Sequence, residues 1–539
     1  MPFVRRLYFP LFLLLILFYA IRPLEGGDDF WAHAAIGRIV LATGSVPRST
    51  VYLWSANVPW VFHAYGSGVI YATLLRLGGP VGGPWLCLAL NFLLAAAPFV
   101  LVWRRAKKLA GEVPSAVVAL LVWAVYLSQI RWRLRPEGFT ILFSTVLLLF
   151  LTAEKRPKWS YVAIAAMFAL WPNLHGGVLI GLLLIWIGAL CQLFDLKRPV
   201  YATSSDPNHA PIERSETPVE RYESTGKRPS PWPLIALALV CSILPLLCNP
   251  WGLGYIHVFA GTEATAKHIS EWRPFWTFPH MSRVFSWGLC ALWGVTFAVW
   301  LLDARRRATT LGALLLVGAL WLQARRQLWV TGGTCAFALA QSAGVLRGDA
   351  LYSSLKRRVV RMDEPMHWIG QIGALLVLLS ACYSARPRGR LLAVAPTAPV
   401  AMSRFLLTQA PKGRTFNDYE YSAALEWYLK GQRPLYIDLI NAYPPGLFDE
   451  WFEVAHASNK GLKVLDEKKI DVVTLRPVSD KDDPIWNLFS YLNKSRDWKL
   501  IYNARDGRVW VRAKPLKTPN PEPSTLSGLG KRARHSEKP

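Results

Sequence analysis

Cysteine is scarce in this chain, and acidic residues are outnumbered by basic ones. Only seven of the 539 residues are cysteine, and the polar sequence that follows Cys382 contains none. The seven lie in hydrophobic stretches, without the spacing of a disulfide framework or a zinc finger. We interpret them as small apolar residues, which excludes a disulfide-stapled scaffold.

Several common catalytic motifs are also absent. The sequence contains no Walker phosphate loop, no GxGxxG fingerprint and no GxSxG nucleophile elbow. Nucleotide hydrolysis and serine hydrolase chemistry therefore have no support. No two histidines have HxxxH or HExxH spacing, which argues against a dedicated zinc site.

The sequence has an excess of basic residues and a high content of hydrophobic residues. There are 61 Lys and Arg against 35 Asp and Glu, and 53% of the residues are hydrophobic. In a soluble domain a net charge of +26 would suggest nucleic acid. Here the basic residues follow the ends of hydrophobic runs. Anionic lipid on the cytoplasmic side of a membrane explains them, and no nucleic acid partner is expected.

Eleven hydrophobic runs predict a polytopic α-helical membrane protein with about eleven transmembrane helices. The runs are Leu7–Ile21, Trp85–Trp103, Val113–Ile130, Phe139–Thr152, Trp159–Leu174, Val178–Phe194, Pro233–Leu247, Val284–Leu302, Leu311–Leu322, Trp329–Val345 and Trp368–Ser384. With the N-terminus inside, basic clusters occupy alternate connections, as the positive-inside rule requires. These clusters are Arg104–Lys108, Lys155–Lys158, Arg305–Arg307 and Lys356–Arg358. The first run lacks a small-x-small cleavage site, so we expect it to be a retained helix.

The polar sequence divides into segments of different character. Residues 199–231, rich in Pro, Ser, Thr and charge, predict a disordered cytoplasmic loop, and residues 516–539 predict a disordered basic tail. Outer juxtamembrane helices are expected over residues 28–78, within a transmembrane domain of residues 1–385. An odd number of spans places residues 386–515 outside the membrane.

The outer segment has the pattern of a small α/β domain. Tyr421–Leu429 has helical periodicity, whereas Leu435–Ile440 and Ile470–Leu475 have the composition of buried strands. A hairpin is predicted around Asp506 and Gly507, because Asp-Gly is a typical hairpin turn.

Two adjacent carboxylates, Asp28 and Asp29, follow the first hydrophobic run. Charge at the edge of a bilayer is costly, which points to a use. One carboxylate would take the proton of an attacking hydroxyl, and the other would orient the acceptor or a metal. The alternative is structural: Asp28 can cap a helix, and Asp29 can favour its dipole. His33, one turn later, can hydrogen-bond Asp29 or contact substrate.

Arginines stand at two outer span ends, on the side of the membrane that the insertion rule disfavours. Arg131, Arg133 and Arg135 alternate with Trp132 and Leu134. An extended chain would place the three arginines on one side. Guanidinium groups bind phosphate bidentately, so the cluster predicts a clamp for a lipid phosphate. Anchoring among lipid headgroups is the competing explanation.

Three further positions belong to the candidate site. Arg325 and Arg326, at the end of the ninth span, form the second arginine cluster and would also hold the phosphate. His175, in the sharp turn NLHGG, is a candidate substrate contact. Glu271 is the acidic residue that would complete a divalent-metal site, for Mg²⁺ or Mn²⁺, with Asp28 or Asp29.

The order of these features resembles the GT-C superfamily of glycosyltransferases, which use polyprenyl-phosphate-linked sugars. The likeness is to the bacterial branch of lipid A and lipopolysaccharide-core sugar transferases. It rests on DDFWAHAAIGRIV, VPRSTVY, PWVFHAYGSGVIY, RLRPEGF, WPNLHGG, NPWG and ARRQ. FNDYEYSAALEWYL and LYIDLINAYP are similar to the outer domain of those proteins. Phe30 stands where related sequences often have Trp, and Gln327 where His is frequent.

The resemblance implies a glycosyltransferase of the bacterial cytoplasmic (inner) membrane. It would move a sugar from a polyprenyl phosphate to an acceptor hydroxyl of a glycan, lipid or protein on the outer face. Asp28 or Asp29 would be the general base, and the arginine clusters would hold the donor phosphate. Two other functions fit the same residues: a transporter or flippase of an anionic lipid-linked substrate, and a non-catalytic membrane assembly protein. A transporter would more often show midplane charges and internal repeats, whereas this sequence has few midplane charges and no clear repeat.

Overall fold

The computed structural model describes residues 2–195, 230–257, 280–303, 307–323, 327–346, 365–388, 390–440, 443–444 and 446–514. Glu271, Arg325 and Arg326 lie outside these residues. So do almost all of the predicted loop 199–231 and the predicted tail 516–539.

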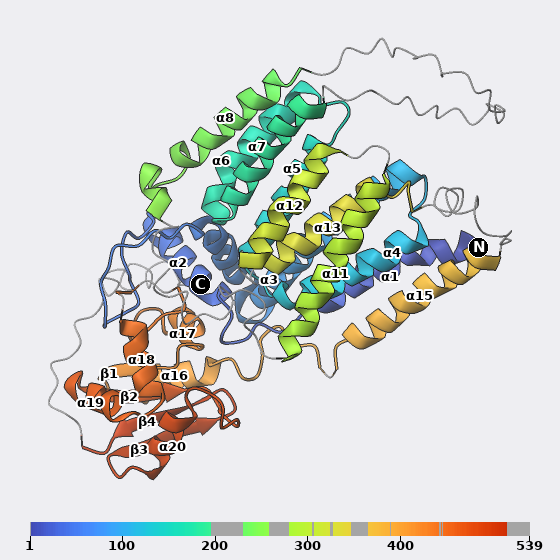
Figure 1. The fold of residues 1–539 in the computed structure, drawn as a ribbon. Helices are drawn as coiled ribbons and strands as arrows, with labels where there is room; N and C mark the ends of the chain where they lie inside the picture. Colours follow the sequence, from blue (N-terminus) through green and yellow to red (C-terminus); the bar gives the residue numbers. More distant parts are fainter. Residues whose placement is uncertain are drawn as a thin grey trace, which may run out of the picture.

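The chain is mostly helical up to residue 385, and we refer to this region as the helical part (Figure 1). Its elements are α1 (Pro2–Ala20), α2 (Phe30–Thr43), α3 (Tyr65–Ala110), α4 (Ser115–Ser128), η1 (Gln129–Arg131), α5 (Glu137–Leu151), α6 (Lys158–Leu174), α7 (Val178–Asp195), α8 (Trp232–Leu247), η2 (Gly252–Ile256), α11 (His280–Leu302), α12 (Ala308–Gln323), α13 (Leu328–Gln341) and α15 (Pro365–Ala385). Each of the eleven hydrophobic runs overlaps one of these helices.

Four of the described helices are long and apolar enough to cross a membrane by themselves. They contain the segments Phe3–Ala20, Tyr65–Ala110, Phe285–Leu302 and Trp368–Ala385. Six shorter apolar helices of 10–17 residues accompany them. A helix of 15 residues spans only about 22 Å, less than the hydrocarbon thickness of about 30 Å. The number of eleven spans therefore stays a prediction, while the integral membrane character of the chain follows from the long apolar helices.

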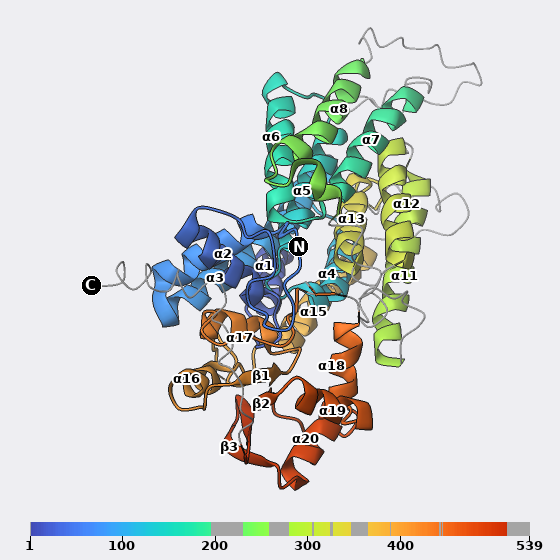
Figure 2. The ribbon, with the colours of Figure 1, turned by 90° about the vertical axis from the view of Figure 1, so that its left-hand side faces the viewer.

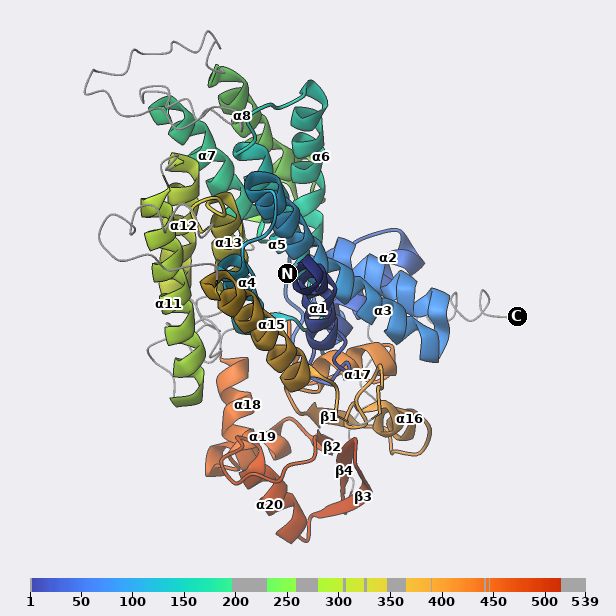
Figure 3. The ribbon, with the colours of Figure 1, turned by 90° about the vertical axis from the view of Figure 1, so that its right-hand side faces the viewer.

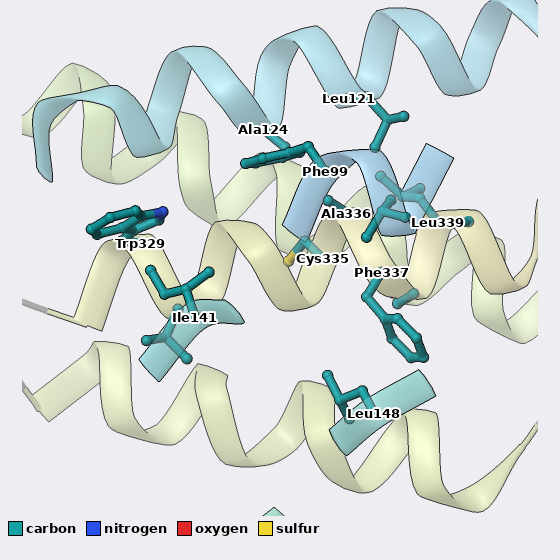
Figure 4. Close-up of a cluster of buried hydrophobic side chains, with 14 of the residues drawn as sticks. Phe99, Leu121, Ala124, Ile141, Leu148, Trp329, Cys335, Ala336, Phe337 and Leu339 are labelled. Atoms are coloured by element: carbon teal, nitrogen blue, oxygen red, sulfur yellow. The ribbon is translucent and has the colours of Figure 1, made fainter. Parts of the chain in front are cut away.

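Helix α13 lies in the interior of the helical part. All of its residues from Leu328 to Gln341 are buried, as expected for a helix that is apolar on every side. Figure 4 shows Trp329, Cys335 and Phe337 of this helix among side chains of neighbouring helices, including Leu148 of α5. This core holds the end of α4 and the start of α5, which flank the arginine segment, in fixed positions.

A short outer layer is formed by α2 and the first half of α3. Gly79 has φ 62° and interrupts α3, so the helix before it turns away from the long apolar helix after it. Helix α2 crosses this first half where Gly37 meets Gly68. A Cβ added at Gly37 would lie 2.0 Å from the Gly68 carbonyl carbon, so only glycine permits the contact. The crossing fixes α2, and with it the aspartates at its start.

The residues after α15 form a smaller region, the C-terminal part, at one end of the helical part in all three views (Figures 1, 2 and 3). Its elements are α16 (Val400–Thr408), β1 (Arg414–Asn417), α17 (Ser422–Leu429), α18 (Leu447–Ala455), α19 (Asn459–Glu467), β2 (Ile470–Leu475), α20 (Trp486–Lys494), β3 (Trp498–Ala504) and β4 (Gly507–Arg512). Among the described residues, the strands form one sheet in the order β1-β2-β4-β3, with β1 and β2 parallel and the other pairs antiparallel. The predicted helix 421–429, the buried strand 470–475 and the hairpin at Asp506 and Gly507 are all present.

The predicted strand over residues 435–440 is wrong. This segment makes only an isolated bridge with Leu53, in which Leu435 donates to the Tyr52 carbonyl at 2.8 Å. The side chain of Asn417 takes the place of a neighbouring strand: its oxygen accepts from the amides of Tyr436 and Ile437 at 2.8 and 3.2 Å. The buried backbone is thus satisfied without a β ladder, which the apolar composition alone could not reveal.

The C-terminal part contacts the segment that carries the two aspartates. Leu24 donates to the Ala393 carbonyl and accepts from the Ala395 amide, both at 2.9 Å. A Cβ at Gly27 would lie 3.2 Å from the Glu420 carbonyl oxygen. Helix α17 also packs on α2. The aspartate segment is therefore held between the helical part and the C-terminal part.

Candidate active site

Asp28 is a buried carboxylate with two partners. Its side chain is only 2% exposed; one oxygen accepts from the Glu25 amide at 2.7 Å and the other from Arg133 Nη1 at 2.9 Å. Burial raises the pKa of Asp28, and the nearby Arg133 charge and the Glu25 amide oppose that rise. The Asp28 side chain thus joins the outer end of the first helix to the arginine segment.

Asp29 stands at the N-terminal end of α2, but its side chain makes no capping hydrogen bond with the helix. Its carboxylate forms an ion pair with Arg135 Nε at 3.4 Å, and the side chain is 38% exposed. The alternative explanation, in which the acidic pair caps the helix, is therefore wrong in that the Asp29 side chain makes no capping hydrogen bond and the Asp28 side chain accepts from the Glu25 amide instead. Two neighbouring carboxylates have different surroundings, one dry and one open to water, and such pairs can take different acid–base roles.

The three arginines of the segment 131–135 each meet a carboxylate. Arg131 pairs with Glu137 at 2.9 Å and Arg135 with Asp29. Arg133 pairs with both Glu25, at 2.8 Å, and Asp28. The segment begins at the end of the 3₁₀ turn η1 and leads into α5, and no two of the three guanidinium groups share one of these carboxylates.

Two buried apolar side chains and one buried amide hold the arginine segment in place. Trp132 and Leu134 are buried, whereas the side chain of Arg133 between them is 35% exposed. Asn91, within the apolar helix α3, donates from its side-chain nitrogen to the carbonyls of Ala20 and Trp132, at 2.9 and 2.8 Å. A single buried Asn thus ties the end of α1 to the arginine segment. Its isolation in a hydrophobic run was the sequence signal that could have identified it.

His33 lies in the first turn of α2, where its amide donates to the Asp29 carbonyl at 3.1 Å. Burial, together with the charge of Arg135, lowers the pKa of His33 to about 4. The ring is therefore neutral near pH 7. It can donate or accept one hydrogen bond at the site but does not add positive charge.

His175 is fixed by hydrogen bonds to one ring nitrogen. Its Nδ1 lies 2.7 Å from Thr140 Oγ1 and accepts from the Gly177 amide at 3.1 Å. Thr140 in turn accepts from Trp171 Nε1 at 2.9 Å, so its own proton is directed to His175. Nδ1 is thus an acceptor, and Nε2 carries the ring proton. The His63 ring lies beside it, with 6.5 Å between the ring centroids. His175 is connected to the arginine segment through the first turn of α5, which carries Thr140.

Two solved structures have a fold similar to that of this chain. AglB, the archaeal oligosaccharyltransferase of Archaeoglobus fulgidus, solved with an inhibitory peptide and a dolichol-phosphate, superposes with a TM-score of 0.51 at 11% identity, covering 87% of this chain and 69% of AglB. ArnT from Cupriavidus metallidurans, bound to undecaprenyl phosphate, superposes with a TM-score of 0.50 at 13% identity, covering 95% of this chain and 98% of ArnT. The fold of this chain is similar to that of these two GT-C glycosyltransferases. No family model matches the sequence, and no curated protein matches it.

Within this GT-C fold, the described residues do not by themselves complete a metal site. No group of three or more His, Cys, Asp or Glu side chains gathers in the part of the chain that the structure describes. Asp28 and Asp29 are instead engaged with arginines, and Glu271 lies outside the described residues. We therefore derive no chemical step through a metal ion.

The GT-C fold also brings in charged residues that sequence reasoning missed. Glu25 pairs with Arg133 at 2.8 Å. Glu420, from the C-terminal part, pairs with Arg476 at 3.3 Å. It lies close enough to Glu25 for the Glu25 charge to contribute to the raised pKa of Glu420. Burial is the main cause of the raised pKa of Glu420, and Arg476 opposes it. No local pattern marks these ion pairs, because each joins residues that are far apart in the sequence.

Proposed function

We propose that this protein is a membrane glycosyltransferase that moves a sugar from a polyprenyl-phosphate carrier to an acceptor hydroxyl on the outer side of the membrane. The observation that carries the proposal is the ion pair of Asp28 with Arg133, inside a GT-C fold. It joins the two groups that such a transfer needs, a carboxylate base and a phosphate-binding cation. The ArnT and AglB structures that share the fold contain undecaprenyl phosphate and dolichol-phosphate.

Asp28 is our candidate for the base. The acceptor oxygen forms a bond to the anomeric carbon, and its proton passes to the Asp28 carboxylate. The bond between the anomeric carbon and the phosphate oxygen breaks, and the polyprenyl phosphate leaves with the electron pair. The burial of Asp28 favours proton uptake, because a base with a raised pKa binds the acceptor proton more strongly. Asp29, which is more exposed, would orient the acceptor while paired with Arg135.

The leaving group needs charge stabilisation more than it needs an acid. A phosphate oxygen that develops negative charge is stabilised by fixed guanidinium groups in a site of low dielectric. Arg133 and Arg135 supply such groups beside the two aspartates. If the donor phosphate binds Arg133, Asp28 loses its cationic partner, and its affinity for the acceptor proton rises. Donor binding would in this way prepare the base.

The side of the membrane follows from charge and from chemistry. The basic connections of the sequence predict that the N-terminus is inside and the C-terminal part outside. Nucleotide sugars are not available outside the cytoplasm, so a sugar carried on a membrane lipid is the appropriate donor there. The proposed enzyme belongs to a cell-envelope membrane, with a glycan, a lipid or a protein as acceptor.

The experiment is a transfer assay with the full-length protein in proteoliposomes. Polyprenyl phosphates that carry radiolabelled pentoses or hexoses are supplied with envelope glycolipid, and Asp28→Asn and Asp29→Asn are compared with the wild type. We expect Asp28→Asn to lower kcat by roughly 10²–10⁴-fold, as loss of a general base does. Full transfer by both variants would overturn the proposed chemistry. Movement of the labelled lipid between leaflets without transfer would favour a flippase instead.

A further inference from the structure

Arg22 stands two residues beyond the end of α1, beside the aspartate segment. Its guanidinium carbon lies 5.4 Å from the centroid of the Tyr19 ring, and its Nη2 donates to the side-chain oxygen of Gln129. Arg22 is partly buried, and Gln129 is buried just ahead of the arginine segment. The guanidinium is thus positioned by a neutral amide and an aromatic face.

Arg22 differs from the neighbouring arginines Arg133 and Arg135 in its ion pairs. Arg133 takes two carboxylates, those of Glu25 and Asp28, and Arg135 takes Asp29. In the described part of the chain Arg22 belongs to no ion pair, and its hydrogen bond goes to an uncharged group. A partly buried guanidinium without a carboxylate partner retains unsatisfied positive charge.

The charge of Arg133 acts directly on Arg22. Burial is the first cause that lowers the pKa of Arg22, and repulsion from Arg133 is the second; Tyr19 and Glu25 act in the opposite direction. Two like charges held close together are unfavourable unless an anion lies between them. Because α1 ends at Ala20, both groups lie at the membrane end where the headgroup of a bound lipid would be.

We infer that Arg22 and Arg133 form the cradle for the phosphate of the lipid-linked donor, with Arg22 as the guanidinium that the phosphate engages first. The inference rests on the proposed function and identifies a phosphate-binding residue that lies outside the arginine clusters of the sequence. A phosphate between the two guanidinium groups would relieve their repulsion and accept charge-assisted hydrogen bonds from both. It would also compete with Asp28 for Arg133, which couples donor binding to release of the base.

Other outer arginines are engaged differently. Arg38 donates to the carbonyls of Glu426 and Trp427, at 3.2 and 2.7 Å, at the end of α17. Arg48 donates to the Pro250 carbonyl at 2.9 Å and packs on Trp251. Backbone carbonyl oxygens, which carry partial negative charge, are thus the hydrogen-bond partners of Arg38 and Arg48. Arg48 is therefore a suitable control for a general loss of positive charge on the outer side.

The experiment measures binding of a short-chain polyprenyl phosphate to the full-length protein in nanodiscs of zwitterionic lipid. Arg22→Gln should weaken binding by on the order of tenfold or more, as expected for loss of a charge-assisted hydrogen bond to phosphate. Gln129→Glu should weaken it similarly, because it gives Arg22 a carboxylate partner without removing the arginine. Gln129→Met removes the amide that positions Arg22 but adds no charge, so it should weaken binding less than Gln129→Glu does. Arg48→Gln should bind like the wild type. In the transfer assay, Arg22→Gln should raise KM for the donor more than it lowers kcat.

The outcomes separate this inference from the proposed function. If the wild type does not bind polyprenyl phosphate at all, the proposed function fails, and this inference fails with it. If the wild type binds but Arg22→Gln and Gln129→Glu bind equally well, the inference is overturned while the proposed function stands. If Arg22→Gln does not fold, as judged by gel filtration, the comparison of Gln129→Glu with Gln129→Met decides the question, since both variants keep Arg22.

Discussion

The carboxylate of Asp28 accepts a hydrogen bond from the guanidinium of Arg133 at 2.9 Å, across 105 positions of sequence. One partner follows the first helix and the other follows α4, so the pair can form only if both helices are in place. Each group is a candidate participant in the same reaction. In the absence of substrate they neutralise one another, which keeps a charged site stable next to the apolar core.

The first prediction concerns the stability of this pair. Arg133→Gln leaves Asp28 buried without its cation, and we expect a loss of about 2 kcal/mol in the free energy of unfolding, since a buried charged group loses its partner. Adding Asp28→Asn should recover part of that loss. Denaturant unfolding in detergent of both single variants and the double variant gives the coupling energy. Strictly additive effects would show that the two side chains do not interact. Arg404→Gln, on the exposed face of α16, serves as the control.

The comparison of Asp28 with Trp329 shows which features the sequence could predict. Trp329 begins a hydrophobic run without charged residues, and such runs predicted the long helices of the described core. The fully buried strand Ile470–Leu475 followed from its composition in the same way. The sequence could not predict Arg133 as the partner of Asp28, because ion pairs between distant segments leave no periodic signal. The same holds for Asn417, whose side chain replaces a strand next to Tyr436.

The second prediction concerns pH. His33 has its pKa lowered to about 4 in the folded protein, against an ordinary value of 6.5. A lowered pKa means that the unfolded chain binds the proton more readily, so stability is full above pH 6.5 and is lost as the pH falls towards 4. We expect a loss of about 3 kcal/mol from this residue across that interval.

The measurement is the free energy of unfolding in detergent between pH 7 and pH 4. His33→Asn should flatten the curve in this interval, because the variant has no group to protonate. His456→Asn, at the exposed end of α18, should leave the curve unchanged. An unchanged curve for His33→Asn would show that the His33 ring is hydrated in the folded protein.

The third prediction concerns the crossing of α2 and α3. Gly37→Ala places a methyl group 2.0 Å from the Gly68 carbonyl carbon, so the helices must separate. We expect a loss of about 2 kcal/mol in the free energy of unfolding, the usual range for overpacking, and reduced sugar transfer because Asp29 moves with α2. Gly82→Ala is the matched control, since nothing lies within 4 Å of its added Cβ. Equal stability of the two variants would contradict the tight crossing.

The last prediction concerns Glu426, a buried acid in the contact between α17 and α2. Its side chain is 1% exposed, and neither carboxylate oxygen has a hydrogen-bond partner in the described part of the chain. Burial raises the pKa of Glu426 well above its ordinary value; Asp438 raises it further, and Arg38 opposes the rise. A carboxyl group in such surroundings is stable only when it is protonated.

A raised folded pKa gives the opposite sign to that of His33. The contribution of Glu426 to stability is present below its unfolded pKa and is lost as the pH rises through the folded pKa. Glu426→Gln keeps the shape and cannot ionise, so we expect it to be more stable than the wild type by about 1–2 kcal/mol above pH 7 and nearly equal to it at pH 4. Unfolding of both proteins at pH 4 and pH 8 measures the difference. Glu467→Gln, at the exposed end of α19, tests whether removal of any acid in the C-terminal part has the same effect. A gain from Glu426→Gln that did not change with pH would mean that the carboxyl group never ionises in this range, and that the stabilisation comes from the new amide alone.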